Sequence, residues 1–146
     1  MSTGPVPLRG RCLCGDVRYT ITPPTDFCAH CHCTSCRRAT GAAFVTWTGV
    51  PTERFALTSG ELTWYRSSAT IRWGFCASCG TTLFYVADAE GHPEQPKLDR
   101  VYVTVATLED PLDRSPSAHV SFEEHVAWFE PGDDLPRHLG KTATQI

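Results

Sequence analysis

The chain alternates apolar and polar residues in short runs for most of its length. Residues 15–21 give the clearest early example, since Val17, Tyr19 and Ile21 alternate with smaller or polar neighbours. This two-residue period is typical of a half-buried β-strand. The Pro-Pro pair at 23–24 then interrupts the pattern. We therefore expect short strands from the start of the chain.

One helical segment and several further strands follow. We expect a helix over residues 34–40, because Thr34 or Ser35 can cap its start and Gly41 can end it. Runs rich in β-branched and aromatic residues give the strands. The predicted strands cover residues 27–31, 43–47, 55–57, 62–65, 71–75, 81–86 and 101–105.

Two stretches carry turn signals instead. A polar loop with Gly91, Pro93 and Pro96 separates the last two predicted strands. From Asp110 onward, four prolines leave little room for long regular elements. Many short strands at this spacing predict a mostly β fold, an all-β sheet or sandwich.

Length and composition indicate one globular domain. The 146 residues suffice to bury a core, and 41% hydrophobic with 20% charged residues is ordinary globular usage. We expect the domain to span residues 9–138, with a flexible tail at 1–8 and a second tail at 139–146. The net charge of −3, and basic residues confined to pairs such as 37–38, argue against a nucleic-acid partner.

The first residues contain no apolar segment of the kind found in secretory signals. No stretch approaches the roughly 18 consecutive apolar residues that a membrane span needs. We therefore expect a cytoplasmic protein with no membrane partner. Thiols stay reduced in the cytoplasm, where clustered cysteines more often bind metal than form disulfides. Eight cysteines beside a single methionine point to metal ligation.

The eight cysteines fall into three motifs, at residues 12–15, 28–36 and 76–80. The first (C-L-C-G) and third (C-A-S-C-G) end in glycine, which permits the tight turn that brings two thiolates onto one ion. Each of these two motifs offers two ligands, and structural zinc takes four. Pairing them predicts a closed four-thiolate site. Its ligands are Cys12, Cys14, Cys76 and Cys79.

Two alternatives stay open for these four residues. They could be buried cysteines without a metal, or form disulfides in an unusual context. In the other alternative, Cys12 and Cys14 share an ion with the cysteines of residues 31–36 instead. The sequence alone favours the four-thiolate pairing over both, because the two doublets carry the same trailing glycine.

The middle motif differs in kind. Cys31, Cys33 and Cys36 form C-x-C-x-x-C with no trailing glycine, and Arg37 and Arg38 follow within the predicted helix. A helix N-terminus and cationic neighbours both favour thiolates. Three thiolates leave the fourth position of a zinc ion open, as in catalytic sites, where water or a substrate thiol can bind and lose its proton.

Several neighbours of this motif are further candidates. Cys28 could close the site as a fourth ligand, or be a small buried strand residue. His30 and His32 could ligate zinc or move protons, although a histidine beside a ligand usually points away; His32 is a candidate general base. Arg37 and Arg38 could bind a substrate carboxylate by bidentate contacts, or be surface charges.

The three cysteine motifs in this order resemble the glutathione-dependent formaldehyde-activating family, which includes centromere protein V. The similarity runs through residues 10–19, 31–38, 41–44, 75–83, 108–111, 119–120, 128 and 134–137. It implies an Mss-four-like zinc-binding β-fold with two zinc ions per chain. In that family the first and last motifs hold a structural zinc, and the central one holds a catalytic zinc. The structural set maps onto Cys12, Cys14, Cys76 and Cys79, and the catalytic set onto Cys31, Cys33 and Cys36.

The resemblance also implies an activity. The family's named reaction condenses formaldehyde with glutathione to S-hydroxymethylglutathione and is classed with the carbon–sulfur lyases, so the partners would be a small-molecule thiol and an aldehyde. Cys28 lies outside the family motif. Two other hypotheses are a binding module in which both zinc ions are structural, and a thiol redox or metal-sensing protein that uses the central cysteines as reactive thiols.

Overall fold

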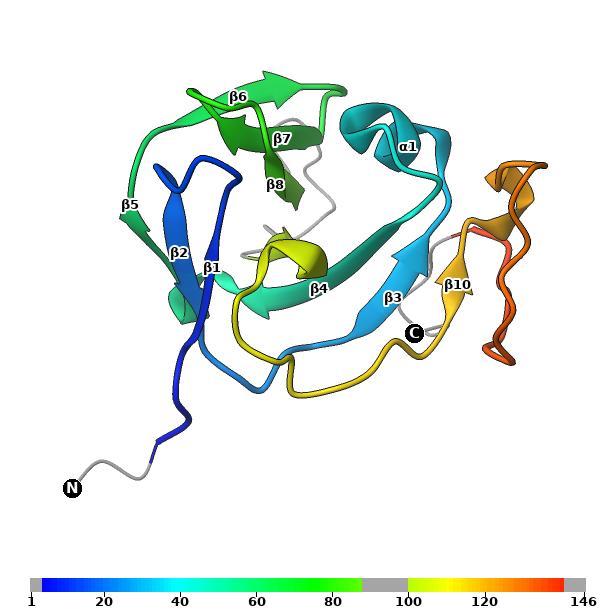
Figure 1. Ribbon diagram of the computed structural model, residues 1–146, viewed down its shortest axis with the longest axis horizontal. Helices are drawn as coiled ribbons and strands as arrows, with labels where there is room; N and C mark the ends of the chain where they lie inside the picture. Colours follow the sequence, from blue (N-terminus) through cyan, green and yellow to red (C-terminus); the bar gives the residue numbers. More distant parts are fainter. Residues whose placement is uncertain (1–3, 88–99, 141–146) are drawn as a thin grey trace.

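The computed structural model describes residues 4–87 and 100–140 and confirms a mostly β chain with one short α-helix (Figure 1). The helix is α1 (Thr34–Thr40). The strands are β1 (Leu8–Arg11), β2 (Arg18–Ile21), β3 (Cys28–Cys31), β4 (Val45–Pro51), β5 (Phe55–Ser59), β6 (Leu62–Arg66), β7 (Ile71–Cys76), β8 (Thr82–Ala87), β9 (Arg100–Thr104) and β10 (His119–Val120). Single 3-10 turns lie at 52–54, 105–107 and 122–124. The predicted loop with Gly91, Pro93 and Pro96 lies outside the described residues.

The strands form two sheets. The smaller has the antiparallel order β1-β2-β5. The larger has the order β10-β3-β4-β9-β8-β7-β6, and all its neighbours are antiparallel except the parallel pair β10 and β3. Figure 1 shows β1, β2 and β5 on one side of the molecule, and β3, β10 and α1 on the other. Strand β10, from the C-terminal segment, is therefore an edge strand of the large sheet. It pairs with β3, the strand that precedes α1.

Two apolar cores hold these layers together. In the first, the small sheet packs on the large one through side chains such as Tyr19, Val50 and Phe84. The rings of Tyr19 and Phe84 meet edge to face at 4.9 Å, and burying each such side chain contributes roughly 1.5–3 kcal/mol. The second core lies around β3, β4 and β7 and contains Trp47 and Trp73. Each core includes cysteines of one predicted site.

Two boundaries differ from the sequence prediction near the N-terminus. β2 begins at Arg18 and not at residue 15, because Gly15 has φ 85° and belongs to the turn that follows β1. Leu8, which we placed in the flexible tail, is the first residue of β1 and packs against the first core. The apolar alternation thus predicted a strand that exists, but the turn after β1, which carries Cys12 and Cys14, occupies the first part of the predicted range.

Helix α1 has the predicted bounds but a different N-cap. Cys33 caps it, since its Sγ accepts a hydrogen bond from the Cys36 backbone N–H at 3.3 Å. Thr34 and Ser35, the predicted caps, are helical. Gly41 ends the helix as expected, with φ 74° and its N–H on the Arg37 carbonyl. A candidate metal ligand therefore also begins the helix.

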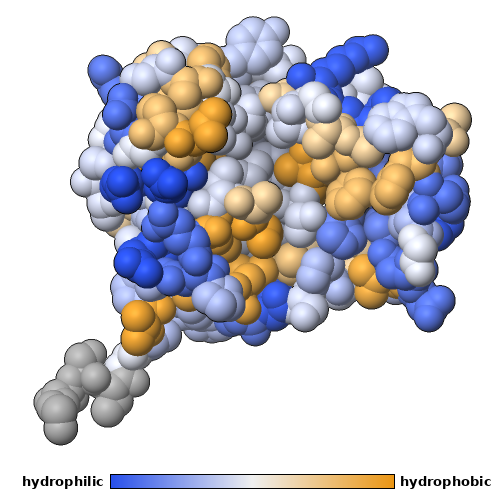
Figure 2. All heavy atoms as spheres, viewed as in Figure 1, coloured by the Kyte–Doolittle hydropathy of each residue, from blue (hydrophilic) through white to orange (hydrophobic). Residues whose placement is uncertain are grey.

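Figure 2 shows the surface in the same view as Figure 1. Apolar and polar side chains are intermingled on this face, which is ordinary for a globular domain. Leu13 and Trp128 are the most exposed of the large apolar residues near the cysteine turn and in the C-terminal segment, at 82% and 76%. Within the described residues, no helix is both long and apolar enough to cross a membrane.

Candidate metal centres

Four cysteine sulfurs from two turns lie together beside the first core. Cys12 and Cys14 follow β1, Cys76 ends β7, and Cys79 lies in the turn before β8. Their Sγ atoms all lie within 4.8 Å of one another, with 3.6 Å between Cys12 and Cys14 and 3.8 Å between Cys14 and Cys76. Sulfurs about 2.3 Å from a tetrahedral zinc ion would lie ~3.8 Å apart. We call this set the four-cysteine group, and it could bind a metal ion.

The arrangement of the sulfurs tests two of the alternatives for these residues, a disulfide and a different pairing of the motifs. A disulfide would bring two sulfurs to about 2.05 Å, much closer than Cys12 and Cys14 or Cys14 and Cys76 lie. The alternative pairing of Cys12 and Cys14 with residues 31–36 also disagrees with the structure, because those cysteines form a separate group. The pairing of the two glycine-trailed motifs is the one that the fold brings about.

Each turn directs backbone N–H groups at sulfur. The pairs are Val17 N to Cys12 Sγ (3.3 Å), Asp16 N to Cys14 Sγ (3.5 Å), Ser78 N to Cys76 Sγ (3.3 Å) and Cys79 N to Cys76 Sγ (3.4 Å). Gly15 and Gly80, with φ 85° and 79°, permit these turns. Such donors stabilise negative sulfur, so each turn is a ready-made pair of thiolate ligands.

The thiols of this group influence each other's ionisation. A hydrogen bond with the Thr81 hydroxyl lowers the pKa of the Cys79 thiol to about 5. The Asp16 N–H lowers the pKa of the Cys14 thiol, but burial and the neighbouring sulfurs outweigh it and raise that pKa to about 12. Like charges this close oppose one another. The group therefore needs a cation to hold four thiolates together.

The second set is Cys31, Cys33 and Cys36, which we call the three-cysteine group. The end of β3 and the first turn of α1 bring the three sulfurs within 4.8 Å of one another. All three side chains are buried, none more than 7% exposed. The structure thus gathers the three residues predicted from the C-x-C-x-x-C motif, and this group too could bind a metal ion.

Cys28, the predicted fourth ligand or buried bystander, lies outside this group. It is the first residue of β3, it pairs with Thr48 of β4, and it is 1% exposed. Burial raises the pKa of its thiol to about 11, against the opposing effect of Arg114. The Cys28 Sγ atom is not among those that the structure gathers in the three-cysteine group.

Aromatic side chains pack on one side of the three-cysteine group. The Trp47 indole Nε1–H donates to Cys36 Sγ at 3.3 Å. Trp47 also packs on Trp73 and Tyr85, with ring centroids 5.9 and 4.7 Å away. Burial, then Tyr102 and the three sulfurs, raises the pKa of Tyr85 well above its usual value. The sequence placed Trp47 on a strand but held no signal for its bond to sulfur.

The two histidines of the motif face a different environment. His30 Nδ1 lies 2.7 Å from Thr46 Oγ1, and His32 Nε2 lies 2.7 Å from His119 Nδ1. Among the described residues, neither imidazole joins a cysteine group. Burial, and then His119, lowers the pKa of His32 to about 4, so His32 is neutral at pH 7. The role of His32 as a general base stays a prediction.

The two arginines follow the group on α1. Arg37 is half-buried, its Nη2 donates to Thr34 Oγ1 at 3.3 Å, and its Nε is buried without a hydrogen-bond partner among the described residues. Arg38 is exposed. Thr34 in turn donates through both N–H and hydroxyl to Glu124 Oε1, at 3.3 and 2.9 Å. Substrate binding by either arginine stays a prediction.

Comparison with known proteins agrees with this architecture. The sequence profile described as "Glutathione-dependent formaldehyde-activating enzyme" matches residues 7–124. The fold is similar to the crystal structure of a Rhodobacter sphaeroides protein, with a TM-score of 0.56, 22% identity, and coverage of 88% of this chain and 98% of that one. Together with the two cysteine groups, the profile match confirms the predicted Mss-four-like β-fold.

Proposed function

The chain belongs to the glutathione-dependent formaldehyde-activating enzyme family, and we propose on this basis that it is a zinc-dependent enzyme of the carbon–sulfur lyase type. It adds a thiol such as glutathione to an aldehyde such as formaldehyde, and it uses two zinc ions, one in each cysteine group. One observation carries the proposal: the first group offers four thiols, and the second, three. Four thiolates complete a structural zinc site, whereas three leave a position for substrate.

The proposed reaction forms two bonds, S–C and O–H, and breaks two, the S–H bond of the thiol and the π bond of the carbonyl. The substrate sulfur bonds to the carbonyl carbon, the π pair of the C=O bond moves to oxygen, and the proton of the thiol ends on that oxygen. Cys31, Cys33 and Cys36 would hold a zinc ion, which would supply a Lewis acid that favours the substrate thiolate near neutral pH.

The chain's own residues have distinct parts in this proposal. Cys31, Cys33 and Cys36 provide the ligands, and the Trp47 N–H donates to the Cys36 sulfur. Arg37, with its buried Nε on the helix that begins at the group, is the candidate for binding a carboxylate of the thiol substrate. Burial of the group keeps the surroundings poor in water, which strengthens electrostatic interactions there.

The test is adduct exchange followed by NMR. Zinc-loaded protein is mixed with glutathione and 13C-formaldehyde, and the interconversion of free aldehyde and adduct is measured. We expect the rate to exceed that of the spontaneous reaction, to fall to that level in Cys36→Ser, and to persist in the matched control Cys28→Ser. A wild-type rate equal to the spontaneous one would exclude glutathione with formaldehyde as substrates.

A second candidate is a non-catalytic binding module stabilised by two structural zinc ions. The burial of all three thiols in the second group favours it, because burial restricts access to the metal. Cobalt-loaded protein separates the two candidates. Added glutathione changes the sulfur-to-cobalt absorption if the three-cysteine site has an open position, and leaves it unchanged if both sites are closed.

A further inference from the structure

Three side chains form a hydrogen-bonded chain from the protein surface to the three-cysteine group. The Asp133 carboxylate oxygens lie 3.0 and 3.1 Å from His119 Nε2. His119 Nδ1 lies 2.7 Å from His32 Nε2. His32 and His119 are each 1% exposed, whereas the Asp133 side chain is 41% exposed. The chain ends at the residue between Cys31 and Cys33.

The Asp133 carboxylate at one end and the unpartnered His32 Nδ1 at the other indicate the direction of the hydrogen bonds between them. An ionised carboxylate only accepts, so His119 Nε2 carries the hydrogen that Asp133 receives. When the His119 ring carries its single hydrogen on Nε2, Nδ1 is a lone pair and accepts from His32 Nε2. His32 Nδ1 is consequently a lone pair. That atom is buried with no partner among the described residues, and an unpaired N–H there would be more costly than an unpaired acceptor.

The C-terminal segment also holds the backbone and the ring of His32. The His32 N–H donates to the Val120 carbonyl at 3.1 Å, and Val120 pairs with Cys31 in the parallel β10 and β3 ladder. The rings of Phe44 and Phe122 lie 5.1 and 5.0 Å from the imidazole. His32 is thus fixed by its main chain, its ring faces and its Nε2.

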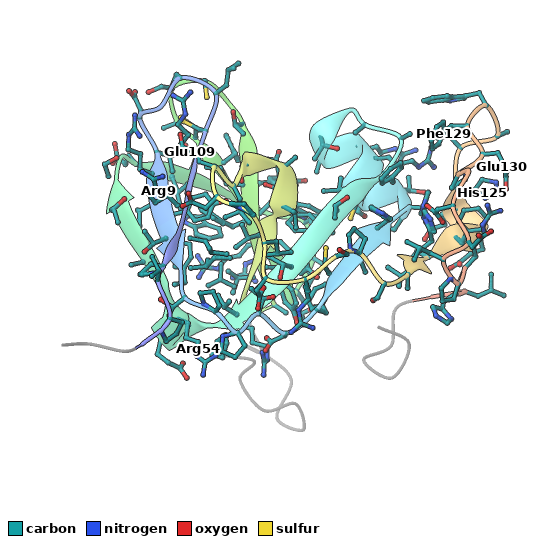
Figure 3. All side chains as sticks on the ribbon, turned by 60° about the horizontal axis from the view of Figure 1, so that its bottom comes forward. Arg9, Arg54, Glu109, His125, Phe129 and Glu130 are labelled. Carbon is teal, nitrogen blue, oxygen red and sulfur yellow. The ribbon has the colours of Figure 1, made fainter. Side chains whose placement is uncertain are left out.

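Figure 3 shows His125, Phe129 and Glu130 on this same C-terminal segment, beside β10 and far from Arg9 and Glu109 at the opposite side of the domain. His125 stacks on Phe122 with ring centroids 4.1 Å apart. Phe129 stacks on Phe44 at 5.9 Å. Phe122 and Phe44, the two rings that contact His32, are thus each in contact with a further residue of the C-terminal segment.

We propose that Asp133 and His119 are positioning residues for the three-cysteine group. They hold His32 in one ring orientation and as the tautomer with hydrogen on Nε2, and so keep the backbone between Cys31 and Cys33 in the geometry that binds metal. This inference rests on the part of the proposed function in which the three-cysteine group binds a metal ion, and it holds whichever reaction the protein catalyses. Outer hydrogen bonds of this kind typically change metal affinity by roughly 10–100-fold.

The test uses 113Cd NMR of the full chain loaded with cadmium, in which each cysteine group gives its own resonance. In Asp133→Asn we expect the three-cysteine resonance to move or broaden and the affinity for that ion to fall about tenfold. The four-cysteine resonance should not move, which shows that the variant is folded. Asp134→Asn removes the neighbouring carboxylate and is the matched control, with both resonances as in wild type.

A second measurement reads the histidine chain directly. 15N NMR of the wild type should show hydrogen on Nε2 of His32, and Asp133→Asn should populate the Nδ1–H form, because an amide can donate to His119 Nε2. The Nδ1–H form in wild type, or an unchanged three-cysteine resonance and affinity in Asp133→Asn, overturns the proposal. If that variant loses both resonances, Asp133→Glu, which keeps a carboxylate, decides: retention of the Nε2–H form and of the three-cysteine resonance supports the proposal, and loss of either overturns it.

Discussion

The two cysteine groups differ first in how much chain they connect. In the four-cysteine group Cys14 and Cys76 are 62 residues apart, so an ion bound there would tie the turn after β1 to the turn after β7. The three-cysteine group comes from residues 31–36 of one segment. Closing a longer loop removes more entropy from the unfolded chain. Metal binding to the four-cysteine group would therefore close a long loop and stabilise the fold, whereas binding to the three-cysteine group would close only a short one.

The groups differ also in what supports their sulfurs. Backbone N–H groups of its own turns surround the four-cysteine group, as from Val17 and Ser78. The three-cysteine group receives a bond from its own helix, but also one from Trp47 on β4, and its strand is held by β10. The sulfurs of the first group are thus supported by their own turns, whereas those of the second are supported in part by residues distant in the sequence.

The largest expected effect comes from breaking the long-range link. Cys76→Ser removes one of the four ligands of the proposed structural zinc site. Because structural zinc sites can contribute ~10–16 kcal/mol of apparent free energy, we expect a loss of at least ~3 kcal/mol of stability. At roughly 2–4 °C per kcal/mol, the Tm falls by ~6–12 °C. Thermal unfolding of the zinc-loaded protein, with zinc content measured in parallel, checks this. Cys28→Ser is the matched control; an equal fall there would contradict the special role of the four-cysteine group.

The second prediction is that a change in the three-cysteine group affects activity more than stability. Cys36→Ser should lower zinc content from two ions to one and abolish thiol–aldehyde exchange, while the Tm falls less than in Cys76→Ser. The difference in loop closure between 62 residues and about five corresponds to ~2 kcal/mol. Metal analysis, exchange NMR and thermal unfolding of both variants measure it. Equal destabilisation would mean that both groups act as structural links.

This contrast also explains which parts of the structure the sequence could predict. The cysteine turns and α1 depend on residues close together in the chain, such as Gly15, Gly41 and Gly80, and their positions were predictable. The N-cap was misassigned because the sulfur of Cys33 competes with hydroxyl caps, which no propensity scale for Ser and Thr anticipates.

The contacts that complete the three-cysteine group could not be predicted in the same way. His119 and Asp133 lie 87 residues or more from His32 along the chain, and β10 has only two residues. Their place depends on the parallel pairing of β10 with β3, which leaves no local pattern. A C-terminal segment rich in prolines indicated only that long regular elements were absent there.

The third prediction concerns the Trp47 hydrogen bond. Trp47→Phe removes the Nε1–H donor to Cys36 Sγ, and we expect the sulfur-to-metal absorption of cobalt-loaded protein to shift and stability to fall by ~1–3 kcal/mol. Trp73→Phe is the matched control, because it removes a similar volume from the same aromatic cluster while its Nε1 donates to Ser67 Oγ at 2.9 Å. A shift of the same size in both variants would assign the effect to packing.

The smallest effect lies on the four-cysteine side, where Arg9 of β1 binds Asp110. Arg9 Nε and Nη2 contact the two carboxylate oxygens at 3.1 and 3.0 Å, and these bonds lower the pKa of Asp110 to about 2. A folded-state pKa below the unfolded value of about 3.9 stabilises the fold above pH ~4, and this contribution is lost as the pH falls towards 2. Arg9→Gln should therefore have a slightly lower Tm than wild type at pH 7, and the difference should shrink between pH 4 and 2.

The control for this pair is Arg54→Gln, since Arg54 donates to the Pro24 carbonyl and its variant should show no such pH dependence. The Arg9 side chain is 68% exposed, so added salt should also reduce the Tm difference between wild type and Arg9→Gln. A Tm difference that persists unchanged at pH 2 would mean that Arg9 acts by packing and not by charge. In that case Arg11, whose Nε lies 2.9 Å from Glu109 Oε1, would be the residue of β1 that forms an electrostatic link to the segment after β9.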